Sequence, residues 1–164
     1  LDLVLNDFVA SATKYKLIKI LSDGSPWRPL IDVEDMARAM IWAILRDDSE
    51  KLLSVNVGSN EWNYQIKDLA VAVKDIIPEA EIEINEDAEP DKRSYKVDFN
   101  LFKSLAGELY PRKKVSESIN ELYDLIQKIN LPLDGFRSTN YLRLNHLKNF
   151  QANGMLDDEL KWVI

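Results

Sequence analysis

Apolar residues recur at helical spacing in several stretches of the chain. Near its start, Leu5, Phe8, Val9 and Ala12 follow the i, i+3, i+4, i+7 pattern. This spacing predicts an amphipathic helix over the first dozen residues, because such positions lie on one helical face. The same reasoning predicts further helices at 33–45, 66–77, 98–105, 115–129 and 138–154.

The helix predicted at 33–45 has the strongest sequence signals. Its apolar residues, at positions 33, 36, 37, 40, 41, 44 and 45, form an unbroken helical face. Asp32 stands where an N-cap is expected, and Glu34 and Asp35 in the first turn favour the positive end of the helix dipole. These signals predict both the start of the helix and its register.

Three shorter stretches are typical of β-strands. Residues 16–21 (KLIKIL) and 81–84 (EIEI) alternate between apolar and polar positions, whereas 52–60 (LLSVNVGSN) is typical of a buried strand that ends at Gly58. Helices and strands in this order favour an α/β or α+β layered fold. Because two or three short strands are marginal as a sheet, we expect some of them to pair with a sheet outside this sequence.

Composition argues against several classes of function. The chain has 164 residues, a formal net charge of −7, no cysteine and one histidine, His146. The negative charge argues against a general nucleic-acid or acidic-membrane binder, and the lack of cysteine excludes disulfides and thiolate metal sites. His146 lies beside Asn145 and Lys148 with no nearby nucleophile, so we expect a solvent-exposed side chain.

The first residues carry no export signal. The sequence does not begin with Met, has no basic n-region, and Asp2 and Asp7 interrupt its apolar run, so we expect neither a signal peptide nor a membrane span, and a cytoplasmic protein. The opening resembles the middle of a helix, which predicts that the chain is a piece of a longer protein.

The stretch DGSPWRPLIDVEDMARA (23–39) holds the first candidate binding residue. Pro26 and Pro29 restrict the backbone on both sides of Trp27 and Arg28. A guanidinium on so stiff a loop suits bidentate capture of a phosphate. The alternative is a surface ion pair between Arg28 and Asp32, Glu34 or Asp35, with Trp27 covering the helix.

Three blocks resemble a known family: ILSDGSPWRPLIDVEDMARAMIWAI (20–44), NVGSNEWNYQIKDLAVAV (56–73) and PDKRSYKVDFNLFKSLAGELYP (90–111). In this order, within residues 1–128, they are similar to the C-terminal half of the NAD-dependent epimerase/dehydratase family, extended short-chain dehydrogenases that act on nucleotide-sugars. The resemblance implies an α/β substrate-binding lobe of a Rossmann-type dehydrogenase at 1–130. Residues 131–164 go beyond the family pattern and form a predicted helical extension.

The resemblance also implies site residues. Arg28 matches the family arginine that binds the nucleotide pyrophosphate, and Asp91 matches an aspartate near the ribose hydroxyls. Many members carry a second arginine a few residues before that aspartate, where this chain has Glu89, so we expect Arg93 or Lys92 to replace it. Asn6 lies where the family approaches the base and phosphates, with a solvated asparagine as the alternative.

The sequence lacks the parts that would hold a cofactor or perform catalysis. It has no GxxGxxG loop, which in a Rossmann fold receives the dinucleotide pyrophosphate. Tyr110 and Lys114 have the Tyr-x-x-x-Lys spacing of the family's catalytic pair, but Pro111 follows the tyrosine and the pair comes after the binding blocks. We therefore predict no catalytic, cofactor-binding or metal residue here, and NAD bound by a domain outside this sequence.

Two further patterns are interpreted as structural. The acidic segment at 79–91 has alternating carboxylates without convergent ligand spacing, which indicates a solvated strand edge. Asn56 and Gly58 match the family's strand end, where we expect a loop-bracing amide and a backbone turn.

The expected function is to bind the nucleotide-sugar in an NAD-dependent sugar epimerase or dehydratase, an isomerase or lyase of carbohydrate biosynthesis. The expected ligand is a nucleoside diphosphate sugar, and a homodimer is compatible with the family. Three alternatives stay open: a reductase or decarboxylase of the same superfamily, a non-catalytic binding or regulatory module, and a helical interaction scaffold.

Overall fold

The computed structural model describes residues 1–47, 52–88, 93–129, 131, 135–136 and 141–163. Helices dominate these residues, and the strands are short. The helical elements are α1 (Val4–Tyr15), α2 (Val33–Leu45), η1 (Asn60–Trp62), α3 (Ile66–Ile76), α4 (Asn100–Ala106), η2 (Gly107–Leu109), α5 (Val115–Lys128) and α6 (Arg143–Ala152). The strands are β1 (Leu17–Ile20), β2 (Trp27–Pro29), β3 (Asn63–Gln65) and β4 (Glu81–Ile84).

The predicted helices are present, with boundaries that follow the local signals. The Asp32 side chain accepts a hydrogen bond from the Glu34 amide and caps α2. Asp98 likewise accepts from the Asn100 amide at the start of α4, and Gly107, with φ 52°, follows its end. The mixed α/β class predicted from the order of elements is confirmed.

Four strands form two separate two-stranded sheets. β1 pairs in parallel with β4, which places Ile18 opposite Ile82, and β2 pairs antiparallel with β3, which places Arg28 opposite Tyr64. The strands predicted at 16–21 and 81–84 are thus confirmed. The segment around Trp27 was expected to be a loop; it is a strand because β3 supplies its hydrogen-bonding partner.

The strand predicted at 52–60 does not form among the described residues. Residues 52–57 belong to no strand, and a short 3₁₀ helix begins at Asn60. The burial predicted for this segment is found only in part: Leu53 and Val55 pack on buried residues, whereas Leu52 is 83% exposed. Within the described ranges, residues 52–57 lack a neighbouring strand, and an extended segment becomes a strand only when another strand forms hydrogen bonds with its backbone groups.

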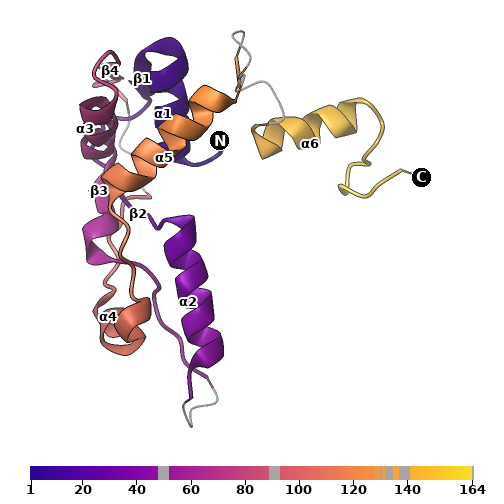
Figure 1. Cartoon of the computed structure of the whole chain (residues 1–164). Helices are drawn as coiled ribbons and strands as arrows, with labels where there is room; N and C mark the ends of the chain where they lie inside the picture. Colours follow the sequence, from indigo (N-terminus) through magenta and orange to yellow (C-terminus); the bar gives the residue numbers. More distant parts are fainter. Residues whose placement is uncertain (48–51, 89–92, 130, 132–134, 137–140, 164) are drawn as a thin grey trace.

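Two apolar clusters hold the chain together. The larger one gathers residues of α1, α3 and α5 around β1, with Val9, Ile18 and Ile119 fully buried. The smaller one joins Trp42 of α2 to Phe102 of α4. In Figure 1, α1, α3 and α5 lie near β1 and β4, whereas α2 and α4 extend away from that group.

Residues 141–163 belong to neither cluster. Figure 1 shows α6 separated from the other helices. Asp2 joins it to α1, since the Arg143 Nε atom lies 2.6 Å from the Asp2 carboxylate. After α6, Gly154 adopts φ 68° and Leu156 forms an isolated bridge with Trp162, so the end of the predicted helical extension is not helical. No helix in the described ranges combines the length and apolarity needed to cross a bilayer.

Candidate functional site

Arg28 is held in the middle of β2, so its backbone position is set by pairing with β3. Its Nη1 atom donates a 2.8 Å hydrogen bond to the Trp27 carbonyl and a second to the Arg93 carbonyl. Such contacts fix the guanidinium near the segment that follows residue 92. The sequence prediction that Arg28 is rigidly placed is therefore supported by the hydrogen-bonding pattern.

The carboxylates offered as alternative partners of Arg28 have other contacts. Asp35 is buried, pairs with Arg38, and accepts hydrogen bonds from the Arg112 and Lys113 amides at 3.1 Å each. Asp32 accepts a hydrogen bond from the Ser118 hydroxyl in addition to capping α2. These carboxylates therefore cap α2 and connect it to α5 and to the residues that precede α5.

Arg28 lines a cavity of about 410 Å³ between α1, the end of β1 and the start of α3. Lys19 brings a second cation to this wall, and Asp7 of α1 brings a carboxylate. Lys19 also pairs with Glu83 on β4 at 3.3 Å. The remaining lining is mostly apolar and includes Val4, Phe8, Ile20, Leu21, Pro26 and Ile66. We call this space the Arg28 cavity.

A second hollow adjoins the Arg28 cavity. It has a volume of about 600 Å³ and includes Arg93, and it shares Val4, Asp7, Lys19 and Leu21 with the Arg28 cavity. The structure thus brings two of the predicted residues, Arg28 and Arg93, to one continuous surface. Lys19 and Asp7 were missed by sequence reasoning, because only the β1–β4 pairing and the turn of α1 bring them there.

Of the other predicted residues, Asn6 lies elsewhere and Asp91 lies outside the described residues. Asn6 lines a different cavity of about 310 Å³, which it shares with Trp62 and Ser118. Because successive helical residues are rotated by about 100°, Asp7 and Phe8 face the Arg28 cavity while Asn6 faces α5. The polar residue that α1 presents to Arg28's surface is Asp7.

The segment after residue 92 lies along β2. The Trp27 amide donates to the Ser94 hydroxyl at 3.0 Å, and the Tyr95 amide donates to the Trp27 carbonyl at 3.4 Å. The Lys96 ammonium lies 3.5 Å from the Trp27 ring centroid, a cation–π contact. Trp27 therefore anchors this segment instead of covering α2, which was the alternative considered for it.

Asparagine side chains brace the chain between residues 56 and 63. The Asn63 amide donates to the Val97 carbonyl and accepts from its N–H, both at 3.0 Å. Asn56 donates at 3.4 Å to the Asp98 carbonyl, as expected for a bracing residue. At Gly58 a Cβ atom would lie 2.6 Å from the Phe99 ring, so close packing requires glycine there.

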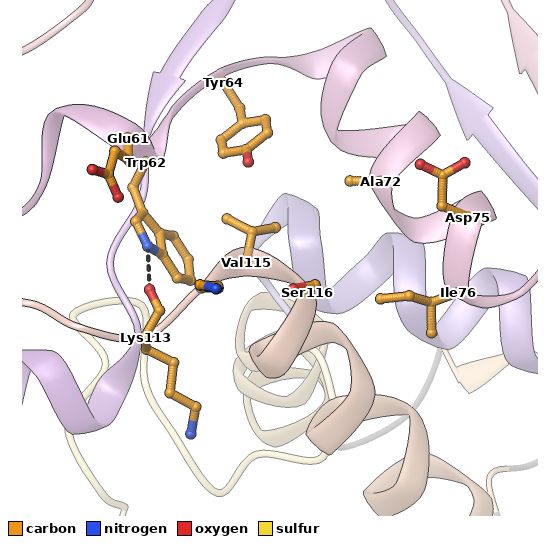
Figure 2. Close-up of a pocket in the computed structure, with 10 residues that line it drawn as sticks. Glu61, Trp62, Tyr64, Ala72, Asp75, Ile76, Lys113, Val115 and Ser116 are labelled. Carbon is orange, nitrogen blue, oxygen red and sulfur yellow. Dashed lines mark hydrogen bonds between the residues drawn. The ribbon is translucent and has the colours of Figure 1, made fainter.

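A further cavity of about 360 Å³ lies between η1, α3 and the start of α5 (Figure 2). The Trp62 indole lines this cavity and donates a 2.8 Å hydrogen bond to the Lys113 carbonyl. Tyr64 lines it too, and partial burial, together with Glu61 and Asp68, raises the pKa of its phenol. This phenol is accordingly protonated near neutral pH.

The remaining titratable groups form no metal cluster within the part of the chain that the structure describes, since no three acidic or histidine side chains converge there as metal ligands. Glu81 and Glu83 of β4 are exposed, as predicted for a solvated edge. His146 is half-buried, not fully exposed as predicted, because its ring packs 4.2 Å from that of Phe150.

One family model matches the first third of the chain. The model of the NAD dependent epimerase/dehydratase family matches residues 2–58, which include β1, β2 and α2. The resemblance to this family is therefore confirmed. The matched stretch contains Arg28, Lys19 and Asp7, so the candidate surface lies largely within the family region.

Solved structures with the same fold are larger than this chain. One is "RMD from Pseudomonas aeruginosa complexed with NADPH", with 16% identity and a TM-score of 0.60 over 77% of this chain and 43% of that one. A second, TunA, is described as an NAD-dependent NDP-hexosamine 5,6-dehydratase, with 20% identity and a TM-score of 0.65 over 82% and 42%. A third is the GDP-mannoheptose C4 reductase MlghC from Campylobacter jejuni with NADP bound, with 21% identity and a TM-score of 0.56 over 77% and 43%. This chain thus corresponds to less than half the length of each.

The family is NAD-dependent, and the described residues do not fit a dinucleotide. The five glycines of the sequence are isolated from one another, so no glycine-rich turn leads into a helix N-terminus. Tyr110 follows η2 and Lys114 precedes α5, so the two do not share a helical turn as a catalytic Tyr-Lys pair would. What the chain does offer is a cationic, partly apolar surface.

Proposed function

We propose that this chain is the nucleotide-sugar-binding part of an NAD-dependent sugar epimerase or dehydratase. The observation that carries the proposal is the placement of Arg28: a strand-held guanidinium lines a cavity that also contains Lys19 and adjoins Arg93. Two phosphates joined by one oxygen match this surface, because arginine binds phosphate oxygens in a forked geometry and lysine adds a point charge.

The cationic side chains around the Arg28 cavity favour an anionic ligand, although the net charge of the sequence is negative. The sequence carries a net charge of −7, so an anion is repelled at long range and must be attracted locally. Arg28, Lys19 and Arg93 supply three cationic side chains along the two adjoining cavities, whose lining also includes the carboxylates of Asp7 and Asp2, so cations outnumber carboxylates there. Such an arrangement favours a small, doubly charged group over a polyanion.

The size and lining of the Arg28 cavity fit part of a nucleotide. A volume of about 410 Å³ lies within the range usual for small-ligand sites. Val4, Phe8 and Ile66 give it an apolar wall, which suits a base or the hydrophobic face of a sugar ring. Asp91, as the proposed ribose ligand, would complete the site from the segment that precedes Arg93 in sequence.

The chemistry itself is assigned to the part of the enzyme outside this sequence. There, NAD supplies reversible hydride transfer when bound, together with a Tyr-Lys pair. The residues of this chain orient the substrate, so that its sugar reaches the nicotinamide in a reactive position. We further propose a cytoplasmic enzyme that acts on a nucleoside diphosphate sugar; a homodimer is compatible with this function.

A thermal-shift panel of nucleoside diphosphate sugars tests the proposal on the product of the whole reading frame that encodes this sequence. At least one member, with uracil, thymine, guanine or cytosine as base, should raise Tm, since a ligand that binds the folded state stabilises it. The shift should disappear in Arg28→Ala. Failure of every member to shift the wild-type protein would reject nucleotide-sugar binding.

A reductase is a second candidate, because one of the structures with this fold is a sugar C4 reductase. A reductase consumes one reduced cofactor per turnover, whereas an epimerase or dehydratase of this kind regenerates its cofactor. Following NADPH absorbance during turnover distinguishes the two. Steady loss of absorbance with product formation would replace the epimerase proposal by the reductase.

A further inference from the structure

The cavity between η1, α3 and the start of α5 is separate from the Arg28 cavity. Its volume is about 360 Å³, and no described residue lines both cavities. Glu61 of η1, Tyr64 of β3 and Asp75 of α3 bring three polar side chains to it (Figure 2). The volume lies within the range usual for small-ligand sites. We call this space the Tyr64 cavity.

These three polar side chains have no partner among the described residues. The Tyr64 phenol and the carboxylates of Glu61 and Asp75 form no hydrogen bond or ion pair there. Their polar atoms meet solvent, since no buried side-chain polar atom in the described part of the chain lacks a hydrogen bond. All three are therefore available to a ligand that enters the cavity.

The electrostatic potential at the Tyr64 phenol is negative. Partial burial raises the pKa of this phenol, and the negative charges of Glu61 and Asp68 raise it further. The phenol therefore stays neutral at physiological pH, while the carboxylates around it carry charge. A negative potential beside an aromatic ring attracts a cation.

The two lysines of the lining leave this negative potential in place. The Lys113 ammonium pairs with Glu121 at 2.6 Å and Glu34 at 3.1 Å, and Figure 2 shows its side chain extending away from the other labelled residues. Lys114 is exposed, and its amide donates to the Glu117 carboxylate at 2.7 Å. That contact occupies an amide at the N-terminus of α5 that could otherwise attract an anion. The lining carboxylates outnumber the lysine charge that remains, that of Lys114.

Apolar groups complete the lining. Ala72 and Ile76 lie one turn apart on α3, and Val115 begins α5. Together with the Trp62 indole they form an apolar part of the cavity next to the Tyr64 phenol (Figure 2). Such a lining favours a molecule that has both a cationic group and an apolar body, because the apolar body leaves water when it binds.

We propose that the Tyr64 cavity binds an organic cation, an ammonium group on an apolar body. The ammonium lies among the Tyr64 phenol and the carboxylates of Glu61 and Asp75, and the apolar body contacts Ile76 and Val115. This site goes beyond the proposed function and does not depend on it, since its ligand has the opposite charge to a nucleotide-sugar and binds in another cavity.

Three ligands of one shape test the charge preference on the product of the whole reading frame. Phenylethylammonium, 2-phenylethanol and phenylacetate share a phenyl ring and differ in charge. In saturation-transfer NMR, the ammonium should bind about tenfold more tightly than the alcohol, because charge-assisted hydrogen bonds are the stronger ones, and phenylacetate should not bind. Equal affinity of the ammonium and the alcohol, or tighter binding of phenylacetate, would overturn the proposal.

Two nearly isosteric substitutions place the site. Glu61→Gln and Asp75→Asn each remove one charge and should weaken phenylethylammonium binding about threefold, and together about tenfold, as expected for partly solvated ion pairs. Asp124→Asn removes an exposed carboxylate of α5 outside the cavity and is the matched control, with no expected change. Wild-type affinity in both single variants and in the double variant would overturn the proposal.

A further variant separates this proposal from the proposed function. Arg28→Ala should leave phenylethylammonium binding as in wild type, whatever its effect on nucleotide-sugar binding, because Arg28 lines the other cavity. Loss of ammonium binding in Arg28→Ala would place the ammonium in the Arg28 cavity and overturn the assignment to the Tyr64 cavity.

The same chemistry can come from a small amine or from a lysine side chain of another protein. N-acetyl-lysine amide represents the lysine side chain and competes with phenylethylammonium in the same NMR measurement. Tighter binding of phenylethylammonium identifies a small amine as the ligand, and tighter binding of the lysine amide identifies a protein side chain. Failure of both compounds to bind would reject the site.

Discussion

At the scale of single residues, the buried carboxylate of Asp35 joins distant parts of the chain. It has 1% exposure, pairs with Arg38, and accepts the Arg112 and Lys113 amides. It therefore fixes the chain entering α5 to α2. The sequence indicated an acidic residue that favours the helix dipole, but the long-range contacts of Asp35 depend on the tertiary fold.

Replacing Asp35 should destabilise the protein. Asp35→Ala leaves the part-buried Arg112 and Lys113 amides without their acceptor and removes the nearer carboxylate from Arg38, and an unsatisfied donor typically costs about 1–3 kcal/mol. Asp35→Asn keeps one acceptor oxygen and should cost less. Urea unfolding of both variants checks this order, with the exposed Asp124→Ala as control; equal stability of Asp35→Ala and wild type would contradict it.

The part of the candidate site that depends on local sequence could be predicted. The two prolines around Trp27 and Arg28, and the family pattern, pointed to Arg28. Lys19 and Asp7 come from β1 and α1, and only the packing of these elements against β2 and α3 brings them to one cavity. The family resemblance suggested Asn6, one position away from Asp7, which lines the cavity.

At the scale of elements, helices were predicted better than strands because helical signals are local. The cap at Asp32 and the spacing of apolar residues define α2 without reference to the rest of the chain. Residues 52–57 have equally good strand character, yet form no strand because pairing needs a partner elsewhere. The conspicuous apolar face of α2 likewise points away from the described core.

The attachment of α6 should weaken in acid. The hydrogen bond from the Arg143 side chain lowers the pKa of Asp2 below its ordinary value of 3.8. A lowered pKa in the folded state means that the contact contributes fully above 3.8 and is lost as pH falls through the lowered value. Hydrogen exchange in residues 143–152, corrected for intrinsic rates, should therefore increase between pH 5 and pH 2.5.

Asp2→Asn is the matched control for this prediction. The amide cannot form the ion pair at any pH, so α6 should exchange rapidly already at pH 5 and change little on acidification. An unchanged pH response in Asp2→Asn would show that another group controls the attachment.

At the scale of the whole molecule, the chain combines a well-buried core with a large exposed apolar surface. α1, α3 and α5 enclose the larger cluster, whereas α2 exposes Met40 and Ile44. Such an apolar surface promotes aggregation when it is exposed to water. Residues 1–164 produced alone should therefore self-associate, and Met40→Lys with Ile44→Lys should reduce the association.

Light scattering of the isolated chain measures this effect. The double variant should have a lower average mass than wild type at equal concentration, whereas Leu144→Lys on α6, also exposed, should have little effect. A monodisperse monomer for the unsubstituted chain would contradict the expectation.

Calorimetric titration of the whole protein with its nucleotide-sugar tests the central claim most directly. A charge-assisted hydrogen bond is worth about 1.5–3 kcal/mol, so Arg28→Ala should weaken binding about ten- to a hundredfold. Arg28→Lys should recover part of the affinity, and Asn6→Ala, in another cavity, should change it less than twofold. An affinity of Arg28→Ala equal to that of wild type would contradict the account.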